Sequence, residues 1–366
     1  MVSGSSERDR GERSMKAYRL RRSAVLVSVL LLTAAACGGA EPTNDSEAAG
    51  EADLVRFAPT APLPAYWPYY YIAEPLGFYE EENIEFELVN AQTAVQQALL
   101  AGRLDISGTG LDYFVQAPTF EDPPKWFMSV DRYLWVMATF EDSPIDGVED
   151  LRGGTIGINE PHDSLDADFM MASAGISEDE YELIPVGQDQ AALAAREAGD
   201  IDAFVTAGAV SMVALQDASD EPLKAIPNEA AESYYNVANM ATVDILENDR
   251  DLAVRFGRAV AKGMIWTWEN PEVAGELLYE VAPESADSVE QAIAFVKAGN
   301  EANRAAYEER GRIDPAIVED MYNKHEELGF LEESYDSEIL FTNDLIDDIW
   351  DFDVEAEIER ARNDER

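Results

Sequence analysis

Cysteine and histidine are scarce in this chain of 366 residues. It has one cysteine and two histidines. A single cysteine excludes an internal disulfide framework and every metal site built from two or four cysteines. Two histidines leave little for a histidine-rich metal centre. The composition therefore argues against these metal sites, and we expect neither a metal nor a cofactor.

Positive charge is scarce as well. The chain has 74 acidic residues and 26 lysines and arginines, a formal net charge of −48. Beyond residue 36 it has 71 acids, 19 bases and only five lysines, a formal net charge of −52. Such a surface repels phosphate backbones, which argues against nucleic-acid binding. It favours a protein built for high external salt, where screening weakens self-repulsion. An acidic exported protein of no special habitat is the alternative.

The N-terminus has the pattern of an export signal. The basic residues 16–22 precede an apolar or small run from Ala24 to Ala36. This run is shorter than the roughly 20 residues that a membrane-spanning helix needs. A basic stretch, a short apolar stretch and small residues before a cut are typical of a secretory signal peptide. We expect this signal over residues 1–36, with Met15 as a candidate start.

The only cysteine, Cys37, follows Thr-Ala-Ala-Ala and precedes Gly-Gly. This arrangement resembles a bacterial lipobox, although Ala34 stands where leucine is usual. The resemblance implies that Cys37 is lipidated and anchors the mature chain to a membrane. An ordinary secreted protein with a spare thiol is the alternative. Residues 37–53 have the composition of a flexible tether.

Beyond the tether, strand and helix patterns alternate in two cycles. Segments Ala98–Ser107 and Leu193–Val205 resemble each other, since each has a helix, a glycine, an aspartate and a buried strand. Such alternation implies α/β architecture with mostly parallel sheets. Expected strands are Leu54–Pro59, Ile84–Val89, Asp105–Ser107, Lys125–Val130, Tyr133–Phe140, Thr155–Ile158, Tyr181–Val186 and Ile201–Val205. Expected helices are one from Pro68, Thr93–Ala101, Ser164–Ala174, Gln190–Ala198, Asp249–Trp268, Pro271–Val281, Ser288–Tyr307 and Pro315–Leu328.

Two similar α/β units suggest two lobes that face a cleft. We expect the first lobe over residues 54–140 and 240–345, and the second over residues 141–239. The chain would cross between them near Phe140 and Tyr235. Residues 346–366 form an acidic C-terminal tail, and the mature chain has no transmembrane segment.

Five segments, in order, resemble a known family. They begin with Tyr-Tyr-Tyr-Ile-Ala-Glu-Pro-Leu-Gly-Phe-Tyr-Glu from Tyr69, and the others are Gln97–Asp105, Asp150–Ile158, Ala198–Phe204 and Trp268–Ala274. The chain is similar to the bacterial substrate-binding proteins for nitrate, alkanesulfonates, taurine and thiamine-precursor pyrimidines. The resemblance implies the type II periplasmic-binding-protein fold, with two lobes that each have a mostly parallel sheet flanked by helices.

The same resemblance implies a function. The protein would capture a small solute by interlobe closure and deliver it to the permease of an ABC importer. It would be a monomer and not an enzyme, held by its lipid on the outer face of the cytoplasmic membrane.

Ligands of open α/β sheets bind beyond the carboxyl ends of strands, often at helix N-termini. This rule selects the four loops 63–67, 108–113, 159–164 and 206–211. Tyr66 and Trp67 would form an aromatic wall for a flat ligand, with burial in the core as the alternative. For the others the alternative is a helix cap or a solvated helix start. The candidate ligand-binding residues are Tyr66, Trp67, Thr109, Asp112, His162, Asp163, Ser164 and Thr206.

The charges of these loops bear on the solute. None of the four contains lysine or arginine, and Asp112 and Asp163 would oppose an anion. The pattern favours a neutral or cationic aromatic heterocycle, such as a thiamine-type pyrimidine. The alternative is a small anion, such as nitrate, a sulfonate or taurine, held by backbone amides at helix starts.

Enzyme motifs are missing from the sequence. It contains no nucleophile elbow, no phosphate-binding Gly-x₄-Gly-Lys loop and no dinucleotide fingerprint. The aspartates after Asp344 lack the glycine and terminal glutamate of a calcium loop, which predicts a solvated acidic face. His325 is expected on the surface of a late helix. The alternative function is an exported enzyme that uses His162 and Asp163 as an acid–base pair.

Overall fold

The computed structural model describes residues 51–364 except 61–62, 92–94, 111–112, 114–115, 133–134, 160–163, 188, 229–233 and 332–334. All of these belong to one of the chain's two units, Gly50–Arg366. The expected signal peptide and Cys37 lie outside the described residues, as do Asp112, His162 and Asp163.

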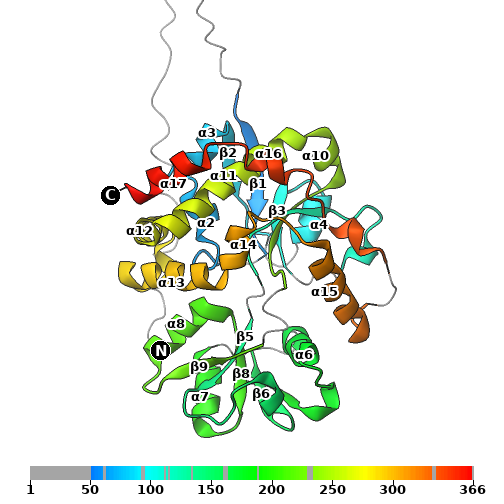
Figure 1. Ribbon diagram of the computed structural model, residues 1–366, viewed down its shortest axis with the longest axis vertical. Coiled ribbons are helices and arrows are strands. Elements are labelled where there is room, and N and C mark those ends of the chain that lie inside the picture. The colour runs from blue at the N-terminus through cyan, green and yellow to red at the C-terminus, as the bar shows by residue number, and fades with distance from the viewer. Residues whose placement is uncertain are drawn as a thin grey trace, which may run out of the picture. The chain divides into compact units, whose positions relative to one another are not determined.

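The first sheet has five strands in the order β2-β1-β3-β10-β4 (Figure 1). β1 pairs in parallel with β2 and β3, whereas β10 runs antiparallel between β3 and β4. In β1, Val55 and Phe57 are buried while Arg56 between them binds Asp105, the alternation of a strand. The bounds are Asp53–Ala58 for β1, Ile84–Leu88 for β2, Ile106–Thr109 for β3, Lys125–Ser129 for β4 and Ala238–Ala241 for β10.

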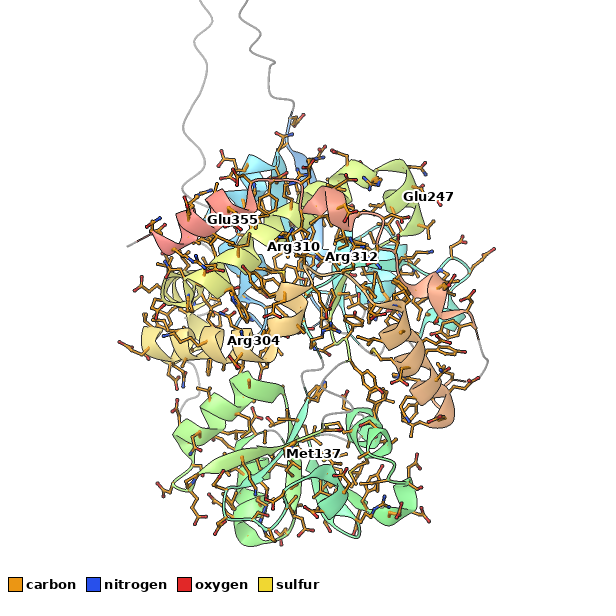
Figure 2. The ribbon with its side chains drawn as sticks, viewed as in Figure 1. Met137, Glu247, Arg304, Arg310, Arg312 and Glu355 are labelled. Carbon is orange, nitrogen blue, oxygen red and sulfur yellow. The ribbon has the colours of Figure 1, made fainter. Side chains whose placement is uncertain are left out.

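The second sheet repeats this plan in the order β7-β6-β8-β5-β9. β6 pairs in parallel with β7 and β8, and β5 runs antiparallel between β8 and β9. Met137 of β5, labelled in Figure 2, is buried in the core of this sheet. The bounds are Val136–Phe140 for β5, Thr155–Ile158 for β6, Glu182–Pro185 for β7, Ala203–Thr206 for β8 and Leu223–Ile226 for β9.

Strand pairing corrects one expected boundary. The sequence pattern places residues up to 140 in the first lobe, but β5 pairs with β8 and β9 and so belongs to the second sheet. The chain therefore crosses between Ser129 and Val136, not near Phe140. It returns between Ile226 and Ala238, a stretch that includes Tyr235. The apolar run 133–140 does not reveal which sheet its strand joins. We call residues 51–129 and 238–364 the first-sheet part, and residues 136–226 the second-sheet part.

The helices cover both sheets (Figure 1). None of the described helices is long and apolar enough to cross a membrane. Those between the strands are α2 (Pro68–Ile72), α3 (Phe78–Glu81), α4 (Val95–Leu100), α6 (Ser164–Ser173), α7 (Gln190–Ala198) and α8 (Gly208–Ala218). Those after β10 are α10 (Val243–Asn248), α11 (Arg250–Glu269), α12 (Pro271–Val281), α13 (Val289–Ala302), α14 (Arg304–Glu308), α15 (Pro315–Glu327), α16 (Ile346–Ile349) and α17 (Val354–Arg362). Short 3₁₀ turns are η1 (Ala117–Thr119), η2 (Val148–Leu151), η4 (Glu178–Glu180), η5 (Pro283–Ser285) and η6 (Ser337–Leu340).

The long helix α11 organises the first-sheet part. It packs against α2, α12, α16 and α17. Gly263 lets α2 approach closely, because a Cβ at this position would lie 2.5 Å from the carbonyl oxygen of Tyr69. α11 ends where Asn270 caps α12 through the Val273 N–H and Pro271 opens the new helix.

The last segment, expected as an acidic tail, is packed against the body of the protein. Ile346 and Ile349 of α16 are buried in the core with α11. Trp266 of α11 donates its indole N–H to Glu357 of α17 over 2.6 Å. Acidic residues on the outer side are solvated, as expected, and Asp347 is 89% exposed. The apolar residues spaced between the acids explain why this acidic segment docks.

Candidate functional site

Two expected site residues turn out to be fully buried. Thr109 ends β3, and its hydroxyl lies 3.3 Å from the sulfur of Met240. Thr206 ends β8, and its hydroxyl donates to Asp189 over 3.1 Å. Both hydroxyls therefore have protein partners and no free face for a solute. Ser164 is the first residue of α6 and is half-buried.

Trp67 lies in the core rather than on a pocket wall, which differs from the expectation. It stands at the N-cap of α2, as its position before a helix indicated. However, the side chain is only 2% exposed. Its indole N–H donates to the carboxylate of Asp131 over 2.7 Å. This buried acceptor explains why the ring turns inward.

Tyr66 joins the two parts of the molecule. Its hydroxyl lies 2.6 Å from the hydroxyl of Ser211 in α8, so a loop after β1 contacts a helix of the second-sheet part. The pKa of Tyr66 is raised to about 12, mainly by burial, and the charge of Asp189 adds to this shift. Tyr66 therefore stays neutral and acts as a hydrogen-bonding group.

Asp189 occupies an unusual backbone conformation beside this bond. It is the N-cap of α7, with φ 32° and ψ −85°. Side-chain-bearing residues rarely adopt such positive φ angles, and the cost is about 1–3 kcal/mol. Its carboxylate accepts from Thr206 and is close enough to perturb Tyr66. A charged side chain held at this energetic cost is typical of a functional position.

Asn159 supplies a side-chain acceptor that no described residue uses. The residue follows β6 directly, and its side-chain oxygen is buried without a hydrogen-bond partner. Leaving a buried acceptor unpaired costs about 1–3 kcal/mol. No lysine or arginine among the described residues bonds to Tyr66, Asn159, Asp189 or Ser211. We call these four residues the candidate site, and its described side chains favour a partner that donates hydrogen bonds.

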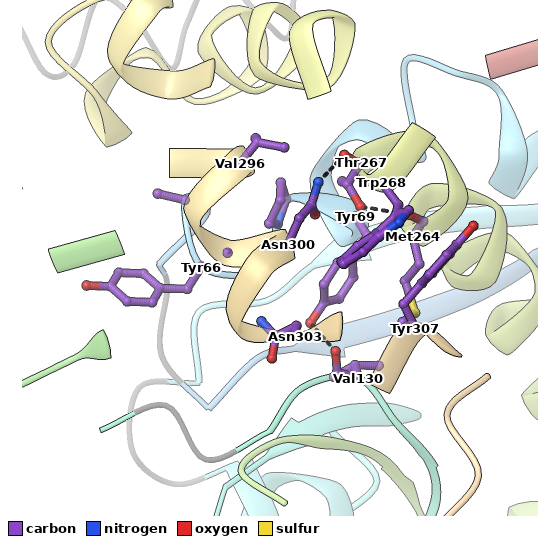
Figure 3. A pocket seen from close by; sticks show the side chains of 13 residues that line it. Tyr66, Tyr69, Val130, Met264, Thr267, Trp268, Val296, Asn300, Asn303 and Tyr307 are labelled. Atoms are coloured by element: carbon purple, nitrogen blue, oxygen red, sulfur yellow. Dashed lines mark hydrogen bonds between the residues drawn. The ribbon is translucent and has the colours of Figure 1, made fainter. Parts of the chain in front are cut away.

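A narrow aromatic pocket flanks Tyr66 in the first-sheet part (Figure 3). Its walls include Tyr69, Met264 and Trp268, and Trp268 stacks on Tyr307 with ring centroids 4.8 Å apart. Figure 3 shows the Tyr66 ring pointing away from this cluster. The cavity volume of about 20 Å³ suits a water molecule or a small substituent rather than a whole ring. None of the described residues that line it carries a charge.

Arginines of α14 and of the residues that follow it already have protein partners. Arg304, Arg310 and Arg312 are labelled in Figure 2. Arg304 lies 5.4 Å from the centre of the Trp268 ring and pairs with a neighbouring glutamate. Arg312 pairs with Asp347 over 2.6 Å. Arg304 and Arg312 therefore already pair with acidic side chains, although both pairs are largely exposed.

His325 is buried, which corrects its expected place on the surface. It is 0% exposed in α15, and its ring lies 4.8 Å from that of Phe169 in α6. Phe169 also packs 5.4 Å from Tyr234. Burial lowers the pKa of His325 to about 4. Phe169 of α6, in the second-sheet part, thus inserts its ring into the first-sheet part. The sequence of α15 alone does not show that His325 has this distant partner.

A model of the NMT1/THI5-like family matches residues 65–274. This range is more than half of the chain. The chain belongs to the NMT1/THI5-like family. No curated protein matches it by sequence. Membership confirms the family resemblance, since the five segments that carried it fall largely within the matched range.

Solved structures confirm the fold class. The periplasmic sulfonate-binding protein SsuA of Methylobacillus flagellatus KT is 14% identical, with a TM-score of 0.62 over 84% of this chain and 96% of its own. The periplasmic nitrate-binding protein NrtA of Synechocystis PCC 6803 is 12% identical, with a TM-score of 0.56 over 82% and 88%. The Candida albicans CA3427 product, described as having the periplasmic binding protein fold, is 17% identical, with a TM-score of 0.56 over 79% and 96%.

Only Tyr66 among the four residues of the candidate site was singled out by the sequence, and the other three were not. Asn159 and Ser211 lie in the selected loops 159–164 and 206–211, so strand-end reasoning locates them without singling them out. Asp189 lies outside all four loops. Its only signal is a position just before a helix that follows a strand, where a capping aspartate is ordinary.

Proposed function

We propose that this protein is the extracytoplasmic solute-binding component of an ABC importer. Membership of the NMT1/THI5-like family supports this, as do similar structures described as sulfonate-binding, nitrate-binding and as the ligand-binding component of an ABC-type import system of Staphylococcus aureus. The observation that carries the proposal is the bond between Tyr66 and Ser211. It joins the two sheet-based parts at their strand ends, where ligands of such folds bind.

In this proposal the first-sheet and second-sheet parts are the two lobes. Rotation about the two crossing segments opens and closes them around the solute. The signal peptide, the lipid on Cys37, the tether and a monomeric state on the outer face of the cytoplasmic membrane complete the proposal. Its partners are the small solute and the importer's permease.

We propose a neutral or cationic aromatic heterocycle, such as a thiamine-type pyrimidine, as the solute. The carboxylate of Asp189 and the unpaired oxygen of Asn159 both accept hydrogen bonds, which suits ring N–H or amino groups. A small anion is the second candidate, favoured by the sulfonate-binding and nitrate-binding names of similar structures. It would be held by backbone N–H groups at the starts of α6 and α8.

A thermal-shift screen tests this proposal. The chain would be heated in high salt with pyrimidines and other heterocycles in one set, and nitrate, sulfonates and taurine in the other. A ligand at 100 times its dissociation constant stabilises a protein by about 2.7 kcal/mol. We expect a heterocycle to stabilise the chain, and Asp189→Asn to weaken that effect. Asp220→Asn, at an exposed carboxylate of the same part, should leave it unchanged.

Other outcomes separate the alternatives. Stabilisation by an anion alone would keep the importer function and overturn the proposed solute class. Conversion of the added compound, followed by mass spectrometry, would identify an exported enzyme instead. Such an enzyme would lose activity in the Asp163→Asn variant. A binding protein returns the compound unchanged.

A further inference from the structure

Asp131 is a fully buried carboxylate with three donors around it. It follows β4 at the beginning of the first crossing. Its two oxygens accept from the Trp67 indole N–H at 2.7 Å, from the Val237 backbone N–H at 2.6 Å and from the Asn236 amide at 3.4 Å. A buried carboxylate is normally found only with such compensation. The three donors come from two different segments of the chain.

Two of these donors lie on the returning crossing. There, the two crossings pair with each other through Val130 N–H to Val237 O at 3.0 Å and through an isolated bridge between Arg132 and Tyr235. The Arg132 guanidinium lies 4.2 Å from the centre of the Tyr235 ring. The crossings therefore form a short ribbon between the sheets. Asp131 belongs to the first crossing, and its carboxylate binds the returning one.

The third donor leads to the candidate site. Trp67 directly follows Tyr66, and their ring centroids are 6.2 Å apart. Tyr66 is the residue that contacts Ser211 of the second-sheet part. One carboxylate thus connects the ribbon to the loop that makes this contact. A rotation that twists the ribbon at Asp131 would therefore move or break the bond to Trp67.

We infer that Asp131 is a positioning residue that couples the Tyr66–Trp67 loop to the ribbon, so that loop position and interlobe angle change together. This inference rests on the proposed function, because the interlobe motion belongs to it. Asp131 does not itself face the candidate site, since its oxygens are occupied within the core. Burial raises its pKa to about 7, against the opposing effects of the Trp67, Val237 and Asn236 bonds and of the Arg132 charge. The phenols of Tyr69 and Tyr70 also face it.

A distance measurement between labels tests the coupling without any ligand. The full chain carrying Cys37→Ser would receive labelled cysteines at Glu197 in α7 and Glu247 in α10, both exposed. Pulsed electron spin resonance then gives the distribution of distances between the two parts. Trp67→Phe keeps the ring but removes the donor. We expect it to raise the population of longer distances about tenfold, the equivalent of one hydrogen bond to a charged group.

A matched control separates coupling from stability. Trp266→Phe removes another buried indole-to-carboxylate bond, the one to Glu357, which lies away from both crossings. It should lower the melting temperature as Trp67→Phe does, and leave the distances unchanged. In the labelled protein without these substitutions, the distribution of distances should also change between pH 6 and pH 8, because Asp131 loses its proton in this range. Asp131→Asn should abolish that change.

Unchanged distances in Trp67→Phe would overturn the inference, as would an equal change in Trp266→Phe. Absence of any stabilising solute would count against the proposed function alone, because the distance measurement needs none. If Asp131→Asn fails to fold, Trp67→Phe and the pH series of the unsubstituted chain still decide the matter.

Discussion

The buried carboxylate of Asp131 should make stability depend on pH in a direction opposite to most acidic residues. Its pKa is raised to about 7 from an ordinary value of 3.8, chiefly by burial. The folded state therefore holds a proton that the unfolded state has already released. This contribution to stability is full below pH 3.8 and is lost as pH rises through 7. Each pKa difference of one equals about 1.4 kcal/mol, so the whole effect is about 4 kcal/mol.

About 2.5 kcal/mol of this effect lies between pH 5 and pH 8. This range is above the isoelectric point of about 4.1, near which the protein would tend to precipitate. The assay is urea unfolding of the unsubstituted chain and of Asp131→Asn across that range. The quantity that matters is the difference between their free energies of unfolding. It should fall by about 2.5 kcal/mol as pH rises. The pH dependence of the unsubstituted chain alone is insufficient, because His325 makes stability rise with pH whereas Asp131 makes it fall.

A difference that stays constant with pH would refute this reasoning. It would mean that Asp131 is already ionised at pH 5 and that its three hydrogen bonds outweigh burial. Asp220→Asn is the control, since an exposed carboxylate should track the unsubstituted curve throughout.

Four further variants test the burial of His325 and the packing around α6, α11 and α13. The pKa of His325 is lowered to about 4, so the stability that the neutral ring contributes is lost as pH falls below 6.5. In urea unfolding, His325→Phe should remove about 2 kcal/mol of the pH dependence of stability between pH 7 and pH 5. Phe169→Ala should cost about 3–5 kcal/mol in the same assay, and a cost below 1 would show that the ring is not packed between the parts. Gly263→Ala should lower the melting temperature, because its Cβ would meet Tyr69 O at 2.5 Å. At Gly299 an added Cβ would have its nearest neighbour, a methyl carbon of Val210, 4.0 Å away. Gly299→Ala should therefore raise the melting temperature slightly.

The elements with strong local signals were predictable from sequence. The strand at Thr155–Ile158 and the helix at Pro271–Val281 have the expected bounds. In the second case Asn270 and Pro271 mark the start by capping chemistry that needs no distant partner. The family resemblance and the fold class followed from such segments and their order.

Elements that depend on distant partners were not predictable. β10 is only Ala-Asn-Met-Ala, and it is a strand because β3 and β4 pair with it and Tyr70 binds Asn239 over 2.6 Å. The expected helix over 288–307 breaks at Asn303, whose side chain accepts the backbone N–H of Arg132 over 2.9 Å. Neither partner is visible in the local pattern.

The candidate site divides in the same way. Strand-end geometry located the loops of Tyr66, Asn159 and Ser211, because the carboxyl ends of parallel strands share an edge. The inward turn of Trp67 was missed, since its acceptor Asp131 lies 64 positions away. Asp189 resembled a helix cap, and only its backbone angles and its effect on Tyr66 distinguish it.

The most direct test of solute capture between two lobes is the distance between labels at Glu197 and Glu247 with and without the solute that most stabilises the chain. Saturating solute should narrow the distribution to its shorter distances, and Asp189→Asn should require more solute for the same change. The solute should be recovered chemically unchanged. An identical distribution with and without bound solute would contradict capture by interlobe closure.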